Sequence, residues 1–380
     1  MFDISKHISI YIHFPWCVKK CPYCDFNSHA IKDDLYTSDI YYKKLIEDFD
    51  THLEDIQGRE IISIFVGGGT PSLFKPEFLE KVLSHIATKS NLSKNCEITL
   101  EVNPGTVERG SITSYQEAGI NRISLGVQSL QDDKLTRLGR IHNSENVYTT
   151  VEEIHKSKIS NFNIDIMHGL PNQSLEDGLY DISEAVKMNP THLSWYQLTI
   201  ELNTLFAVKT PTLPNEEVLE QIEIGGKEIM LNAGYKQYEI SAYAKNGKNS
   251  VHNSNYWFFG DYIGIGAGAH SKITNLKTNE IKRTWKHKHP KIFTQANILI
   301  KDTAIVTKDE LVYEFMINAL RLKNGFDINT FYKHTFLSFE HILKDVQIGV
   351  KKGLLMFDNN QVKATDKGYL FLNDCINLFI

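Results

Sequence analysis

The feature that most restricts the fold of this chain is a regular alternation of strand-like and helix-like segments over its first 235 residues. Runs rich in β-branched and aromatic residues predict six strands: Ile8–Phe14, Ile61–Val66, Glu97–Val102, Arg122–Val127, Phe162–Met167 and His192–Leu198. Between and after them, apolar residues at helical spacing predict helices, among them Tyr36–Glu54, Glu77–Ala87, Val107–Ala118, Leu175–Met188 and Glu216–Ala233. Six such units in a row predict an α/β fold with parallel strands and crossover helices. The pattern leaves two architectures open, a doubly wound sheet and a complete or partial barrel.

The remaining third of the chain predicts a different organisation. The alternation lapses after Tyr235, and we expect a barrel-like core over residues 1–235 and a connecting segment over 236–300. Residues 301–380 predict a small α+β domain of winged-helix type, with helices Glu310–Leu320 and His341–Lys352 and a hairpin at Leu354–Ala364. Because no basic stripe with base-reading residues accompanies it, we expect no nucleic-acid partner.

Composition agrees with a globular protein and excludes some alternatives. The chain has 41 basic and 46 acidic residues, a net charge of −5, so no excess of positive charge favours nucleic acid. No apolar run approaches the ~18 residues that a membrane span needs. No secretory signal is visible, and we expect a cytoplasmic protein.

The five cysteines are unevenly distributed. Because five is an odd number, they cannot all pair within the chain. Cys17, Cys21 and Cys24 form a C-x3-C-x2-C pattern directly after the first predicted strand, whereas Cys96 and Cys375 lie in apolar patterns typical of a core. Three thiolates on one loop can hold three corners of a [4Fe–4S] cluster and leave one iron open. A structural zinc site would need a fourth ligand, and no second arm with comparable spacing follows.

Other unusual residues follow the predicted strands at their carboxyl ends, where α/β folds place their chemistry. Three glycines, Gly67–Gly69, end the second strand, and Glu101-Val102-Asn103-Pro104 ends the third. Gln128 follows the fourth strand, and Asp165 interrupts the apolar fifth strand, where a carboxylate is costly without a partner.

The cysteine pattern and the segment Phe65–Pro71 resemble the radical S-adenosylmethionine (SAM) superfamily. The resemblance implies a partial (β/α)6-type barrel, a [4Fe–4S] cluster on the three cysteines, and SAM chelated at the open iron. In that superfamily, reduction by the cluster cleaves SAM to a 5′-deoxyadenosyl radical. The positions that match the family's SAM-binding residues are Tyr11, Tyr23, Gly68, Gly69, Thr70, Glu101, Gln128, Arg140 and Asp165.

Several segments together resemble the coproporphyrinogen III oxidase-like branch of that superfamily: Tyr11–Cys17, Cys24–Ser28, Gly67–Pro71, Gly126–Ser129 and Asp165–Pro171. The dehydrogenases of this branch carry a further cysteine two residues after the third, where this chain has Phe26. This difference favours the branch's heme-chaperone subgroup. The segment His252-Asn253-x-x-Tyr256-Trp257 resembles a motif of that subgroup and implies that His252 binds heme, since imidazole is a common axial ligand. His168 and His270, which lie on glycine-flanked turns, are the weaker alternatives.

The resemblance therefore implies three cofactors or ligands, a [4Fe–4S] cluster, SAM and heme, and a function in delivering heme to acceptor hemoproteins such as respiratory enzymes. It also implies a homodimer, and peripheral membrane contact if the acceptors are respiratory complexes. The electron donor and the acceptors are not identified by the sequence. The alternatives are oxidative decarboxylation of coproporphyrinogen III and radical chemistry on another substrate.

Overall fold

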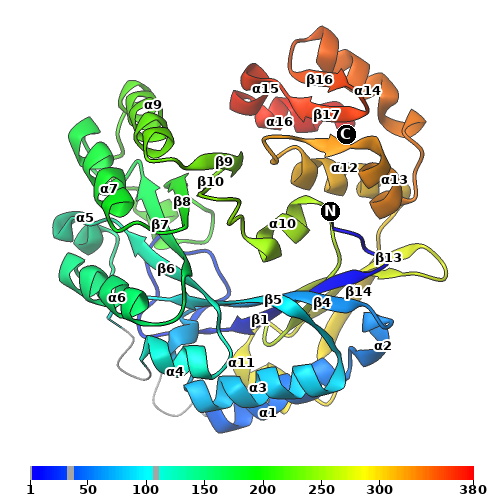
Figure 1. Cartoon of the computed structure of the whole chain (residues 1–380), viewed down its shortest axis with the longest axis horizontal. Coiled ribbons are helices and arrows are strands. Elements are labelled where there is room, and N and C mark those ends of the chain that lie inside the picture. Colours follow the sequence, from blue (N-terminus) through cyan, green and yellow to red (C-terminus); the bar gives the residue numbers. More distant parts are fainter. Residues whose placement is uncertain (1, 32–37, 106–110) are drawn as a thin grey trace.

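The computed structural model describes residues 2–31, 38–105 and 111–380. The six predicted strands lie side by side in chain order and are all parallel: β1 (His7–Phe14), β4 (Glu60–Gly68), β5 (Asn91–Val102), β6 (Arg122–Gln128), β7 (Asn161–His168) and β8 (His192–Gln197). A doubly wound sheet would reverse its strand order at a switch point. The consecutive order, and the arc that the strands form in Figure 1, are those of an incomplete barrel, which confirms the predicted fold class.

The crossover helices cover the outer face of the arc (Figure 1). They include α1 (Ser38–Asp50), α3 (Pro76–Lys89), α4 (Ile112–Glu117), α6 (Ser144–Lys156), α7 (Leu175–Lys187) and α9 (Glu216–Asn232). The first turns of the predicted helices Tyr36–Glu54 and Val107–Ala118 fall in residues outside the described ranges. None of the helices in those ranges combines the length and apolarity needed to cross a membrane.

Residues 236–305 extend the sheet at both of its edges. β11 (Tyr262–Ile265) pairs in parallel with β1, and β12 (His270–Asn275), β13 (Glu280–Lys286) and β14 (Ile300–Ile305) continue beyond it in antiparallel order. β10 (Ala242–Ala244) and β9 (Lys236–Glu239) extend the other edge beyond β8. The helix between these groups, α10 (Val251–Trp257), lies on the inner side of the arc (Figure 1). Residues 236–300, expected only to connect two domains, therefore contribute β9 to β13 to the large sheet, and β14 begins at the last of them.

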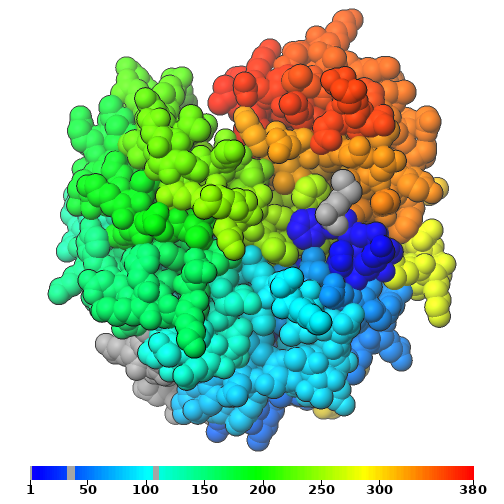
Figure 2. All heavy atoms as spheres, viewed as in Figure 1, coloured from blue at the N-terminus to red at the C-terminus, as the bar shows by residue number. Residues whose placement is uncertain are grey.

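The C-terminal part has its own apolar core around Phe315, beneath α12 (Lys308–Ala319), α13 (Ile328–Thr335) and α14 (Glu340–Lys351). A three-stranded sheet completes it: β15 (Phe326–Asp327), β17 (Gln361–Ala364) and β16 (Leu355–Asp358). The hairpin turns at Asn359 and Asn360, whose φ angles of 48° and 64° are those a type I′ turn requires. Figure 2 shows this part as an orange and red lobe, with the first residues of the chain in dark blue at its junction with the barrel.

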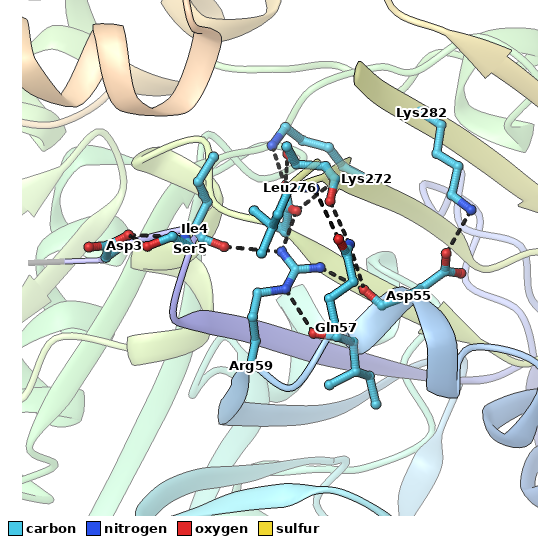
Figure 3. Close-up of polar contacts among 12 residues, drawn as sticks. Asp3, Ile4, Ser5, Asp55, Gln57, Arg59, Lys272, Leu276 and Lys282 are labelled. Carbon is cyan, nitrogen blue, oxygen red and sulfur yellow. Dashed lines mark hydrogen bonds and ion pairs between the residues drawn. The ribbon is translucent and has the colours of Figure 1, made fainter. Parts of the chain in front are cut away.

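A fully buried ionic cluster links the segment before β4, the segment before β11, and β12. Asp261, which follows α10, accepts hydrogen bonds from Arg59 Nη1 at 2.6 Å and from Lys272 Nζ at 2.7 Å. All three side chains are 0–1% exposed. The guanidinium of Arg59 also donates to the backbone oxygens of Ile4 and Asp55 (Figure 3). The two cations hold the pKa of Asp261 at about 2, although burial alone would raise it.

We predict that Asp261→Asn lowers the free energy of unfolding by about 3 kcal/mol or more, because it leaves two buried cations without their counter-charge. Chemical unfolding followed by circular dichroism measures the change. Glu152→Gln is the control, since Glu152 pairs with Lys156 on an exposed helix face and its loss is expected to leave stability unchanged. An equal, small effect of both substitutions would contradict the prediction.

Candidate functional site

A cavity of about 470 Å³ lies at the carboxyl ends of the parallel strands. All of the residues predicted to hold a cluster or SAM, with the exception of Tyr11, lie in its wall: Cys17, Cys21, Tyr23, Cys24, Gly68, Gly69, Thr70, Glu101, Gln128, Arg140 and Asp165. These residues come from the loop after β1 and from the ends of β4 to β7, together with the segment that follows α5 (Asp132–Arg137). The strand order thus brings together residues that are up to 148 positions apart.

The cysteine loop is held by a small parallel pairing between β2 (Trp16–Cys17) and β3 (His29–Ala30). The backbone N–H of Ile31 donates to the oxygen of Cys17 at 2.9 Å, and that of Cys24 donates to the oxygen of Cys21 at 3.2 Å. These bonds close the loop on itself and bring its three thiols to one wall of the cavity. The other two cysteines are buried elsewhere, Cys96 in the barrel core and Cys375 in the C-terminal core.

A [4Fe–4S] cluster can bind three thiols that are spread along one loop. In a [4Fe–4S] cluster each thiolate binds a different iron, so the three sulfur atoms do not have to converge on one point. Within residues 2–31, 38–105 and 111–380, no group of three His, Cys, Asp or Glu side chains is placed to hold a single metal ion. Burial raises the pKa of the Cys17 and Cys24 thiols, and iron coordination would oppose this by favouring the thiolates.

The glycine triplet has a packing role that is visible in the structure. The N–H groups of Gly69 and Thr70 each donate at 2.7 Å to the strand that leads into Cys17, at the oxygens of Phe14 and Trp16. A Cβ atom on Gly69 would lie 2.5 Å from the oxygen of Trp16, and one on Gly68, whose φ is 120°, would lie 2.6 Å from the ring of His13. Only glycine permits this close approach.

Arg140 is fixed against the cluster loop. Its Nη2 donates to Asn103 Oδ1 at 2.5 Å and to the oxygen of Gly126 at 2.8 Å, while its Nη1 lies 3.7 Å from Cys21 Sγ. Asn103 in turn donates to Thr70 Oγ1 at 3.0 Å. Asn103 also lines the cavity, although it is not among the residues predicted to bind a ligand. Its position two residues after Glu101, at the end of a strand, is the sequence feature from which its place in the cavity wall could have been predicted.

Two carboxyl groups in the cavity wall are shifted toward their neutral forms. Burial raises the pKa of Glu101 to about 8, although its Oε2 accepts the N–H of Gly68 at 3.0 Å. Burial also raises the pKa of Asp165, whose oxygens accept from Asn163 Nδ2 at 2.7 Å and from Ser124 Oγ at 3.2 Å. Each carboxyl can therefore present either a donor or an acceptor to a ligand.

Gln128 reaches the wall from an unusual backbone conformation. Its φ is 73°, in the left-handed region that few residues other than glycine adopt, and its Oε1 accepts a hydrogen bond from the hydroxyl of Tyr196 at 2.9 Å. Strain of this kind persists where the surrounding structure determines it, and it is concentrated at functional sites.

A second cavity, of about 390 Å³, adjoins the first, and Phe26, Gly68 and Glu101 line both. Tyr11, predicted to contact SAM, lies in the wall of this second cavity. Its wall also contains aromatic and basic side chains: His13, Tyr256, Tyr262, His270 and Lys288.

His252, predicted to bind heme, lies in the wall of neither cavity and is 1% exposed. Its Nδ1 is 3.0 Å from Ser63 Oγ, and its Nε2 is 3.0 Å from the hydroxyl of Tyr256. Burial lowers its pKa to about 3, so the ring is neutral. Since both ring nitrogens are engaged, His252 cannot bind a heme iron in this conformation unless α10 moves and Tyr256 gives up its contact.

Comparisons with known proteins agree with the fold. Residues 11–182 match the radical SAM superfamily, and residues 306–371 match the HemN C-terminal domain. The heme chaperone HemW of Haemophilus influenzae is 45% identical, and that of Escherichia coli 44% identical, with 98% of each chain covered in both cases. HemW of Bacillus subtilis is 32% identical over 98% of this chain and 99% of its own. A solved structure also matches, that of E. coli coproporphyrinogen III oxidase, which is described as a radical SAM enzyme. Its TM-score is 0.81 over 98% of this chain and 90% of its own, and because the two sequences are only 20% identical, the match shows a shared fold.

We predict that Glu101 makes stability depend on pH. Its folded-state pKa of about 8 exceeds its ordinary value of 4.5, so the folded chain binds more protons than the unfolded chain between these limits. Its contribution is therefore fully present below pH ~4.5 and is lost as the pH rises through about 8, with a slope of at most ~1.4 kcal/mol per pH unit. The free energy of unfolding is measured between pH 5 and 8.5 without added ligand. The isosteric Glu101→Gln should remove this slope from its plot against pH, whereas Glu152→Gln should retain it. Identical slopes in the wild type and Glu101→Gln would contradict the prediction.

Proposed function

Because the chain belongs to the HemW family of the radical SAM superfamily, we propose that it is a heme chaperone, which binds heme and passes it to acceptor hemoproteins such as respiratory enzymes. In this proposal it also carries a [4Fe–4S] cluster and SAM. The observation that carries the proposal is the pair of adjoining cavities, one lined by three cysteines and the other by aromatic and basic side chains. An iron–sulfur site and a flat apolar ligand would then share one wall.

We propose that Cys17, Cys21 and Cys24 hold the cluster and that the first cavity holds SAM. When bound, the cluster supplies reducing electrons and an open iron at which SAM can be chelated. Arg140, fixed by Asn103, places positive charge beside Cys21, where it opposes the negative charge of a thiolate-bound cluster.

The remaining cavity residues offer hydrogen bonds to a nucleoside and an amino acid. Glu101 and Asp165 both line the first cavity, and their raised pKa values favour protonated forms that can donate to, as well as accept from, hydroxyl and amino groups. Gln128 adds an amide, and Tyr23 adds a ring for stacking. Gly68, Gly69 and Thr70 contribute backbone next to the thiols.

We place heme in the second cavity. Its volume falls within the range of about 300–1,000 Å³ typical of small-molecule sites. Tyr11, Tyr256 and Tyr262 offer ring faces to a macrocycle, and Lys288 offers a cation to its propionate groups. The prediction that His252 binds the iron requires a second conformation of α10; in the described one His252 supports the cavity through Tyr256.

The alternative is oxidative decarboxylation of coproporphyrinogen III, which the shared fold with the E. coli oxidase and the matching C-terminal domain permit. Phe26 argues against it. This residue stands where the dehydrogenases have a further cysteine, and its 60% exposed ring lies in the walls of both cavities, where it offers apolar surface to heme.

We predict that Cys21→Ser abolishes the cluster, because two thiolates and a hydroxyl do not replace three thiolates. After anaerobic reconstitution with iron and sulfide, the variant is expected to retain less than about a quarter of the wild-type iron and to lose the brown absorbance. Cys96→Ser, which changes a buried cysteine outside the cavity, is the control and should retain both. Normal iron and sulfide content in Cys21→Ser would overturn the assignment of the ligands.

The proposed function is tested by measuring the transfer of heme from this protein to an acceptor. The reconstituted protein is loaded with ferric heme, mixed with the heme-free form of a bacterial cytochrome subunit, and followed by absorption and by acceptor activity. We expect transfer faster than from an equal concentration of heme on albumin. A parallel incubation with coproporphyrinogen III, SAM and a reductant is expected to give no protoporphyrinogen. Sustained product formation without heme transfer would establish the decarboxylase instead.

A further inference from the structure

Two cavity histidines differ in the freedom of their rings. His13 is 5% exposed and engaged at both nitrogens, with Nδ1 3.0 Å from the hydroxyl of Tyr11 and Nε2 2.9 Å from the oxygen of Asn27. His270 is exposed, and its ring nitrogens have no hydrogen-bond partner in the described part of the chain. An iron ligand needs a free nitrogen lone pair, and His270 combines unengaged ring nitrogens with a place in the wall of the second cavity.

His270 is also held in a fixed position. It begins β12, directly after the turn Gly266–Ala269, and Asn27 Nδ2 donates to the oxygen of Ala267 at 3.0 Å and to that of Lys288 at 2.9 Å. A Cβ atom on Gly268 would lie 2.3 Å from Asn27 Nδ2, so the turn requires glycine to approach this side chain. The end of the cysteine loop thereby fixes the turn that carries His270.

The surroundings of His270 suit a metal-bound macrocycle with acidic side chains. Its ring packs edge to face against Trp285, with centroids 5.9 Å apart, which restricts its rotation. Partial removal of the ring from water, together with the charges of Lys288 and Arg283, lowers its pKa, which favours the neutral, ligating form at pH 7. Lys288 lines the same cavity and can pair with a propionate.

On the basis of the proposed heme-binding function, we infer that His270 is the residue that binds the heme iron in the second cavity, and that His252 is a positioning residue that holds Tyr256 in the cavity wall. Heme would lie between Phe26 on the outer side and Tyr256 with Tyr262 on the inner side. The two roles differ in one respect that can be measured, because only the loss of an axial ligand changes the coordination of the iron.

The test uses the full-length, cluster-reconstituted protein and ferric heme, titrated in the wild type and in His270→Ala, His252→Ala, Tyr256→Phe and His287→Ala. Soret position, electron paramagnetic resonance and Kd are recorded for each, and circular dichroism checks folding. His287, half-buried on the segment after β13 and outside the cavity wall, is the matched control.

We expect His270→Ala to lose the histidine-ligated spectrum and to weaken heme binding at least about tenfold, and added imidazole to restore the spectrum. His252→Ala and Tyr256→Phe should weaken heme binding to an extent similar to each other and leave the spectrum unchanged. His287→Ala should resemble the wild type in both affinity and spectrum. A wild-type spectrum in His270→Ala, or its loss in a folded His252→Ala but not in Tyr256→Phe, overturns the assignment while heme binding stands. If the wild type itself does not bind heme, both the assignment and the proposed function fail.

Discussion

The carboxylate of Asp261 anchors the start of β11, the strand that carries Tyr262 into the wall of the second cavity. It is buried between Arg59 and Lys272, and its backbone oxygen accepts the N–H of Ser9 at 3.1 Å. It therefore sets β11 beside β1, the strand that leads to the cysteine loop. Because a buried charge tolerates little displacement from its partners, the start of β11 is held close to Arg59, which lies 202 residues earlier in the chain.

A second constraint is the polar interior of the barrel. From the first cavity, Asp165 bonds to Asn163, whose Oδ1 lies 2.7 Å from His192 Nδ1. His192 Nε2 lies 2.8 Å from the hydroxyl of Tyr238, which accepts the N–H of Ser250, the N-cap of α10. Every member is buried or half-buried and has a partner, as buried polar groups require. The helix α10 is thus attached by hydrogen bonds to a wall of the cysteine-lined cavity.

The sequence predicted the elements that depend on local pattern. The six parallel strands are apolar runs with turn residues after them, and the cavity residues follow because parallel strands end at one edge. The strands of residues 236–305 were not predicted, since β11 depends on a distant partner and on Asp261 rather than on its own four residues. Nor could spacing reveal that His252 is buried: a His and a Tyr four positions apart share one helix face whether that face meets a ligand or, as here, Ser63 and the barrel wall.

The wall shared by the two cavities has a thermodynamic consequence. Phe26, Gly68 and Glu101 belong to both, and Gly68 and Glu101 are joined by a hydrogen bond. A molecule that displaces any of them from one side alters the space and the polarity that the other side offers. Reciprocity then requires that each occupant change the affinity for the other by the same factor. If both cavities are occupied, the two affinities are therefore coupled through these three residues.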